Sequence, residues 1–196
     1  MRRSVSLVVI AAVAIGVQSA SIGLPTAEAS AVSRDLARYL VRADEEPGFR
    51  PTVRRPVVSS AKAWVRGMPA AVAAATIKRY AVEGFVAATG ERMKGADGAE
   101  GIDLVNEFKS HAGAMREMTW LIHWAHPTRR FAVNGVPSAA GTIQVLASTS
   151  AANVYWVQGR CTLGIGDYLP HSVHPLTSPL IKAAQTLYRR TGGSCP

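Results

Sequence analysis

The sequence lacks the short motifs that identify the common classes of cofactor-dependent and hydrolytic enzymes. No glycine-rich turn leads from a predicted strand into a helix, as phosphate and dinucleotide sites require. Ser138 lies between glycines, but its spacing does not match the nucleophile elbow of an α/β-hydrolase. These absences leave P-loop, dinucleotide-binding and serine-hydrolase functions without support, and we expect no cofactor.

Cysteine is scarce, with only Cys161 and Cys195 in 196 residues. Two thiols are too few to form a zinc site by themselves. In an exported protein an even cysteine count favours a disulfide, although a pair of free redox thiols is the alternative. The two positions are 34 apart, so closing this loop would stabilise the fold by about 4 kcal/mol.

A long apolar run occurs only near the amino terminus. It covers residues 5–17 and follows Arg2 and Arg3, the positively charged start of an export signal. The run is shorter than the roughly 20 apolar residues of a membrane-spanning helix. An Ala-x-Ala motif at 27–29 offers a cleavage site before Ser30.

These features predict a cleaved signal peptide at residues 1–29 and a single secreted domain at residues 30–196. The alternative is that the signal stays in place as a membrane anchor. No cysteine lies near the end of the apolar run, so lipid attachment has no acceptor thiol. The predicted location is therefore outside the cell.

The mature chain would have 167 residues, enough for one hydrophobic core. Its net charge would be +8, because the signal removes two arginines and one glutamate from a total of +9. A basic surface favours anionic partners such as an acidic wall polymer or a lipid surface. The cations form dispersed pairs and no long tract, and we expect a monomer with no nucleic-acid partner.

Hydrophobic periodicity and turn residues predict helices first, then hairpins, then a closing helix. The expected helices cover 30–42, 60–66, 70–82, 110–124 and 177–190, and the expected strands cover 85–93, 102–108, 130–133, 142–147, 153–158 and 160–165. The proline-containing stretch 49–59 is expected to be irregular. This order indicates an α+β fold, an antiparallel sheet of five or six strands with helices packed on it.

Alternation along two strands predicts which side chains face the solvent. In the strand at 102–108, Asp103 and Glu107 alternate with apolar residues, so both carboxylates are expected on an exposed face. Their spacing gives little support to a glycosidase pair. Tyr155 and Trp156 point to opposite faces of their strand, which predicts that one is buried and the other exposed.

Two histidine pairs are the only groups that suggest metal chemistry. His171 and His174 lie in a proline-bounded loop after Asp167, and two imidazoles with one carboxylate could hold a metal ion. His123 and His126 lie at the end of the helix at 110–124. Solvated histidines without a ligand are the alternative for both pairs.

Trp120 and Trp124 are four residues apart and therefore share one face of the helix at 110–124. Together with a methionine-containing stripe they make this helix apolar around much of its circumference. A well-buried helix explains the pattern, and a partner surface at the two tryptophans is the alternative.

Several turn and strand motifs run through most of residues 31–196: Leu40 followed by Glu46-Pro47-Gly48-Phe49, Glu83-Gly84-Phe85, Phe108-Lys109-Ser110, Val133-Asn134-Gly135-Val136-Pro137, and Asn153-Val154 before Gly159-Arg160-Cys161. In these motifs the chain resembles small, uncharacterised secreted proteins of high-GC actinobacteria, and more loosely envelope lipoproteins with a PsbP-like α+β sandwich. The resemblance implies a sheet-and-helix sandwich with a binding role at or beyond the cell surface. It transfers no catalytic residues.

The sequence therefore predicts a secreted, non-enzymatic binding or interaction module with an unidentified ligand, and leaves an enzymatic role as the alternative. The rival is an extracellular hydrolase or metal-binding protein that uses Asp167, His171 and His174. A third hypothesis is electrostatic docking on anionic wall polymer or lipid.

Overall fold

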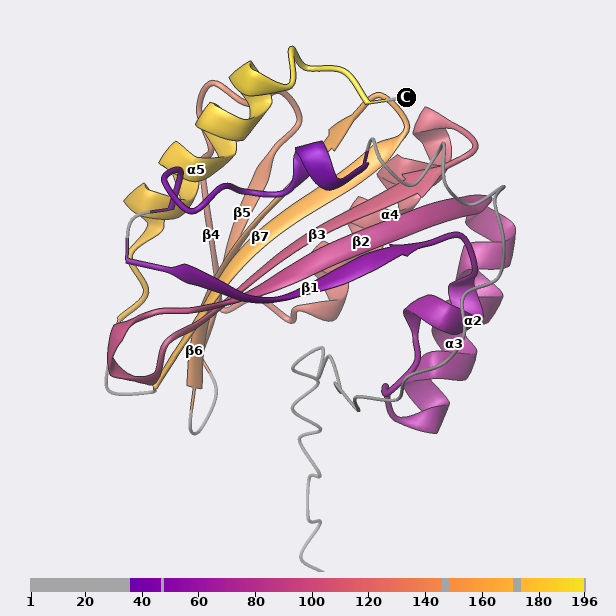
Figure 1. Ribbon diagram of the computed structural model, residues 1–196, viewed down its shortest axis with the longest axis horizontal. Coiled ribbons are helices and arrows are strands. Elements are labelled where there is room, and N and C mark those ends of the chain that lie inside the picture. Colours follow the sequence, from indigo (N-terminus) through magenta and orange to yellow (C-terminus); the bar gives the residue numbers. More distant parts are fainter. Residues whose placement is uncertain (1–35, 47, 146–148, 171–173, 196) are drawn as a thin grey trace, which may run out of the picture.

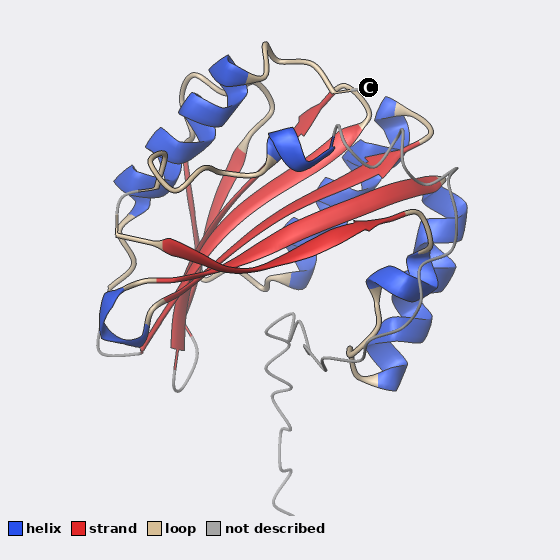
Figure 2. Ribbon diagram, in the orientation of Figure 1, coloured by secondary structure: helices blue, strands red, loops and turns tan. Residues whose placement is uncertain are grey.

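The computed structural model describes residues 36–46, 48–145, 149–170 and 174–195. The predicted signal peptide at 1–29 lies outside the described residues, and so do His171 and residues 30–35 of the helix expected at 30–42. The described part of that segment forms only a short 3-10 helix at Ala37–Tyr39. The described chain forms a single antiparallel sheet with helices on both faces (Figures 1 and 2).

Seven strands form the sheet in the order β1-β2-β3-β7-β6-β5-β4, and each neighbouring pair is antiparallel. They are β1 (Arg50–Val58), β2 (Phe85–Lys94), β3 (Glu100–Phe108), β4 (Arg129–Phe131), β5 (Ala140–Val145), β6 (Thr149–Gln158) and β7 (Cys161–Pro170). The sheet consists of two meanders, β1-β2-β3 and β4-β5-β6-β7, which join where β7 pairs with β3. The α+β class is confirmed, and the expected five or six strands were too few.

The additional strand is β1, where an irregular stretch was expected. Its prolines, Pro51 and Pro56, lie on an edge strand that has a neighbour on one side only, and its ladder with β2 shows two register shifts. Proline is tolerated at such an edge because its missing N–H can face away from the neighbouring strand. The prolines therefore mark the edge of the sheet, and the prediction of an irregular arm was wrong.

The helices begin and end where local signals place them. They are η1 (Ala37–Tyr39), α2 (Ala61–Trp64), α3 (Ala70–Glu83), η2 (Ala96–Gly98), α4 (His111–Trp124) and α5 (Thr177–Arg190). Ser110 caps α4 by accepting a hydrogen bond from the Gly113 amide at 3.1 Å, as predicted. Gly84 ends α3 in the left-handed conformation, with φ 77°. No helix among the described residues is long and apolar enough to cross a membrane.

Two hydrophobic cores lie on opposite faces of the sheet. One core joins η1 and α5 to the sheet, and the other joins α2, α3 and α4 to it (Figure 1). Because both faces are covered, Tyr155 and Trp156 are both buried, and so are Asp103 and Glu107. The prediction of a solvent-facing side for these two strands was wrong.

Candidate functional site

A depression of about 410 Å³ lies at the β4–β5 end of the sheet. It is lined by Thr128, Arg129, Ile143, Val145, His174 and Pro175. Arg129 lies directly across from Ile143 in the ladder, and Val145 follows two residues later, so these three side chains share one face. Thr128 fixes this corner, since both its amide and its hydroxyl donate to the Ile143 carbonyl, at 2.8 and 3.1 Å.

The wall of the depression is apolar and open to solvent. Ile143 is 5% exposed and forms the floor, while Val145 remains 48% exposed. Leu176, the residue after Pro175, is 71% exposed, although it lies immediately before α5. Large apolar side chains left open beside a concavity are typical of binding surfaces.

The surroundings of the depression are poor in negative charge. From Met118 to the carboxyl terminus the only acidic residue in the sequence is Asp167, and it is buried. The same segment contains six arginines and lysines. Arg129 and Arg130 form no ion pair with any described residue, so the rim carries uncompensated positive charge.

The members of the predicted histidine–aspartate site lie in different surroundings. His174 is exposed and lines the depression, whereas Asp167 is buried on β7, opposite Gly101 and Ala152. His171 lies outside the described residues. Within the described ranges, no group of three or more His, Cys, Asp or Glu side chains could hold a metal ion. The metal site with Asp167, His171 and His174 therefore stays a prediction.

Asp167 belongs instead to a buried carboxylate cluster with Glu46 and Asp103. Residues 36–46, which we call the strap, cross the α5 face of the sheet and place Glu46 over β3 and β7. Both oxygens of Glu46 and one oxygen each of Asp103 and Asp167 have no hydrogen-bond partner among the described residues. Asp103 accepts a hydrogen bond from the Val41 amide of the strap through its other oxygen.

Burial makes these three carboxyl groups hard to ionise. Burial, together with the negative charges of Asp167 and Asp103, raises the pKa of Glu46 to about 9. Burial likewise raises the pKa of Asp103 to about 8 and that of Asp167 to about 6. Glu46 and Asp103 are therefore largely protonated at neutral pH, whereas Asp167 is largely ionised, so the cluster holds about one negative charge without a cation.

Trp120 and Trp124 stack on each other with ring centroids 5.4 Å apart, and both are half-buried. The Arg79 guanidinium lies 3.8 Å from the centroid of Trp120 and forms ion pairs with Glu83 and Glu117. Trp120 thus packs against a buried ion-pair network between α3 and α4. A partner surface at the tryptophan pair stays a prediction.

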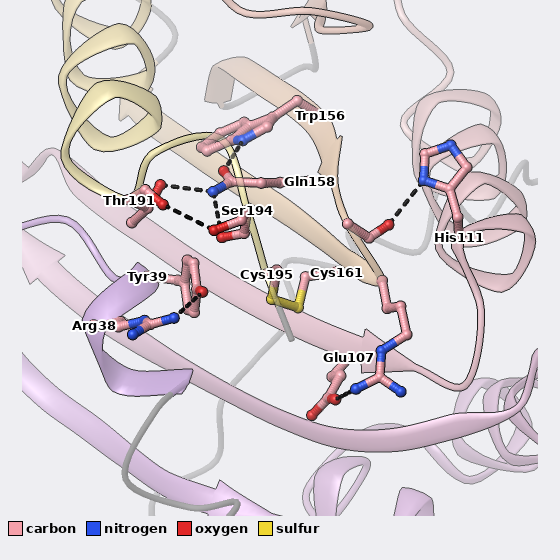
Figure 3. The surroundings of a disulfide bond; sticks show 12 residues. Arg38, Tyr39, Glu107, His111, Trp156, Gln158, Cys161, Thr191, Ser194 and Cys195 are labelled. Carbon is pink, nitrogen blue, oxygen red and sulfur yellow. Dashed lines mark hydrogen bonds and ion pairs between the residues drawn. A yellow bond between two sulfur atoms is a disulfide. The ribbon is translucent and has the colours of Figure 1, made fainter.

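Cys161 and Cys195 form the disulfide expected from the sequence (Figure 3). Gln158 supports the same corner, since its Nε2 donates to Thr191 Oγ1 and to the Ser194 carbonyl, each at 2.7 Å. The bond ties the chain end after α5 to the start of β7 and is buried on the core side. The disulfide therefore has a structural role, and no cysteine among the described residues is free.

The depression could not be predicted from the sequence, because its walls come from three separate segments: 128–129, 143–145 and 174–175. Only the pairing of β4 with β5 and the return of the chain after β7 bring them together. One sequence signal pointed to this region, namely the near absence of acidic residues after Glu117.

No family model matches the chain, and no curated protein matches it. Among solved structures, the extracellular domain of PknH from Mycobacterium tuberculosis is similar, with a TM-score of 0.53 and 14% sequence identity. The similarity covers 86% of this chain and 98% of that domain. At this identity it shows a shared fold alone, and the PsbP-like resemblance stays a prediction.

Proposed function

We propose that the mature chain is an extracellular, non-enzymatic binding module whose ligand occupies the depression at β4 and β5. The observation that carries the proposal is this concavity of about 410 Å³, which has an apolar floor and an open mouth. Ligand sites typically combine such a floor with a few polar groups that fix orientation, here Thr128, Arg129 and His174.

Two observations support a location outside the cell. The Cys161–Cys195 disulfide is of a kind that persists in oxidising compartments and is rare in the cytosol. The PknH domain, which shares the fold, is an extracellular domain. When the full chain is produced in a bacterium, we expect export, an amino terminus at Ser30 and an intact disulfide, all measurable by mass spectrometry. A cytosolic, uncut and reduced protein would contradict the proposal.

The binding site is tested by screening the mature protein with neutral apolar fragments in two-dimensional NMR. Fragments that bind should shift the amide signals of β4 and β5 and of residues 174–177 before other signals. A screen in which the hits map to other elements, or in which nothing binds, would contradict a site at the depression.

A metal-dependent role through Asp167, His171 and His174 is the rival proposal. It is favoured by the free Oδ1 atom of Asp167 and by the exposure of His174 near the depression. Metal analysis of the purified protein separates the two functions: one equivalent of zinc, lost on His171→Ala and on Asp167→Asn, would support the rival and defeat a non-enzymatic binding role without metal.

The excess of cations favours an anionic wall polymer or lipid surface as the macromolecular partner. Such docking would be screened by salt, because the charges that carry it are exposed. The protein should be retained on anionic polymer or vesicles at low salt and released at moderate salt. Equal retention at both salt levels would argue against this partner.

A further inference from the structure

The floor and rim of the depression differ in chemical character. Ile143, Val145 and Pro175 provide an apolar surface, and the exposed Leu176 follows Pro175 directly. Arg129 and His174 lie on the rim, and none of the described residues that line the depression carries a carboxylate. A ligand that matches both parts has an apolar chain and a negatively charged end.

Arg129 is free to serve as the anion-binding group. It is exposed, its position opposite Ile143 places it on the depression face, and it forms no ion pair with any described residue. A guanidinium can bind a carboxylate through two parallel hydrogen bonds, which fixes the orientation of the head group.

The start of α5 adds positive potential at the same place. Pro175 lines the depression and α5 begins two residues later, at Thr177. Leu176 provides no side-chain cap, and the first turn contains no acidic residue. The unpaired amides at a helix start carry partial positive charge, so they reinforce the attraction that Arg129 exerts on an anion.

We propose that the depression binds a single-chain carboxylate, that is, an acyl chain with a free carboxyl end, with the chain on Ile143 and Val145 and the carboxylate on Arg129. This inference rests on the proposed function and names the ligand class of the same site. The volume of about 410 Å³ suits one chain, since it lies near the lower end of the range for small-molecule sites.

The experiment is calorimetric titration of the mature protein with decanoate, below the concentration at which it forms micelles. Decanol carries the same chain without the charge, decyltrimethylammonium carries the opposite charge, and acetate carries the charge without the chain. We expect one decanoate to bind, decanol to bind about tenfold more weakly, and the cation and acetate not to bind.

Two variants test the assignment of the residues. Arg129→Gln should weaken decanoate binding about tenfold and leave decanol binding unchanged. Arg189→Gln is the matched control, because it removes the same charge from the exposed far end of α5 and should change neither. Val145→Asp should abolish binding of both ligands, since it places a carboxylate on the chain-binding surface. Unchanged thermal unfolding shows that each variant is folded.

The results separate this inference from the proposed function. If decanol binds as tightly as decanoate, or if Arg129→Gln behaves like Arg189→Gln, the site binds apolar groups without selecting an anion, and the inference fails while the binding module stands. If neither ligand binds but neutral fragments still shift the β4 and β5 signals, only the ligand class is wrong. Binding of decanoate solely as part of anionic vesicles would replace the single-chain ligand with a lipid surface.

Discussion

Arg190, the last residue of α5, forms a bidentate ion pair with Glu45 of the strap, with contacts of 2.6 Å from Nε and 2.9 Å from Nη2. The same guanidinium donates to the carbonyls of Arg38 and Leu40. The side chains of Arg190 and Glu45 are only 16% and 5% exposed. One arginine therefore holds the strap, which lies 145 residues earlier in the chain, against the sheet.

We predict that Arg190→Ala lowers the free energy of unfolding by about 3 kcal/mol, because it leaves the buried Glu45 carboxylate without its cation. Urea denaturation followed by circular dichroism measures the loss. Arg189→Ala is the control: Arg189 is exposed and, among the described residues, its side chain bonds only to Thr186, so its removal should cost less than about 0.5 kcal/mol. Equal losses in the two variants would show that the strap does not depend on Arg190.

The buried carboxylate cluster predicts that the free energy of unfolding falls as the pH rises. Folded-state pKa values of about 9 for Glu46, 8 for Asp103 and 6 for Asp167 exceed the ordinary values of 4.5, 3.8 and 3.8. The folded protein therefore binds protons more tightly than the unfolded chain. The contribution of the cluster to stability is complete below about pH 4 and is lost as pH rises toward 9.

Glu46→Gln removes the largest part of this dependence, because glutamine stays neutral at every pH. A pKa difference of one corresponds to about 1.4 kcal/mol, so the variant should exceed the parent in stability by on the order of 2–4 kcal/mol at pH 8 and match it near pH 4. Urea melts at both pH values measure the difference. Asp44→Asn, an exposed carboxylate of the same strap, is the control that should show no such gain. Parallel curves for the parent and Glu46→Gln would refute the buried cluster.

The disulfide predicts a loss of stability under reducing conditions. Removing the Cys161–Cys195 bond by Cys161→Ala together with Cys195→Ala should cost about 3 to 4 kcal/mol, because the unfolded chain regains the freedom of a 34-residue loop. Reductant should lower the urea midpoint of the parent and leave that of the double variant unchanged. A parent that ignores reductant while its disulfide is demonstrably reduced would contradict this role.

The two tryptophans should differ in their contribution to stability. Trp120 packs on Arg79 and on the second core, whereas Trp124 is the last residue of α4 and stacks on Trp120. Trp120→Ala should therefore cost about 2 kcal/mol and Trp124→Ala less than about 1 kcal/mol, as measured by thermal unfolding. If Trp124→Ala is the more costly change, Trp124 contributes more to stability than Trp120, and the prediction is wrong.

Elements with strong local signals could be predicted from the sequence. The Ser110 cap and the apolar stripe of α4 placed that helix correctly, and the period of Leu180, Ala184 and Leu187 placed α5 with its observed bounds. The hairpin of β2 and β3 was also expected, because a glycine-containing turn separates two alternating segments.

The errors arose where distant parts of the chain decide the outcome. Asp103 looks solvent-facing in its own strand, but the strap, which begins more than 60 residues earlier, covers it and donates a hydrogen bond to it from Val41. Pro51 and Pro56 argued against a strand because nothing local shows that β1 lies at an edge. The depression was missed for the same reason, since Arg129, Val145 and Pro175 meet only in the complete fold.

The pairing of β3 with β7 marks a place where the protein can be divided into two fragments. Each meander is continuous in the chain. The two are joined in sequence through α4, and in space by this seam, by the packing of α4 on β6 and β7, and by the contact of Arg190 with the strap. A break between Ala125 and Thr128, beyond α4, would leave two halves, each with a row of unpaired backbone groups that fits the other, and α4 of the first half would also pack on β6 and β7 of the second. The protein is thus suited to fragment complementation, and the reunion of two separately produced halves could report on the proximity of proteins fused to them.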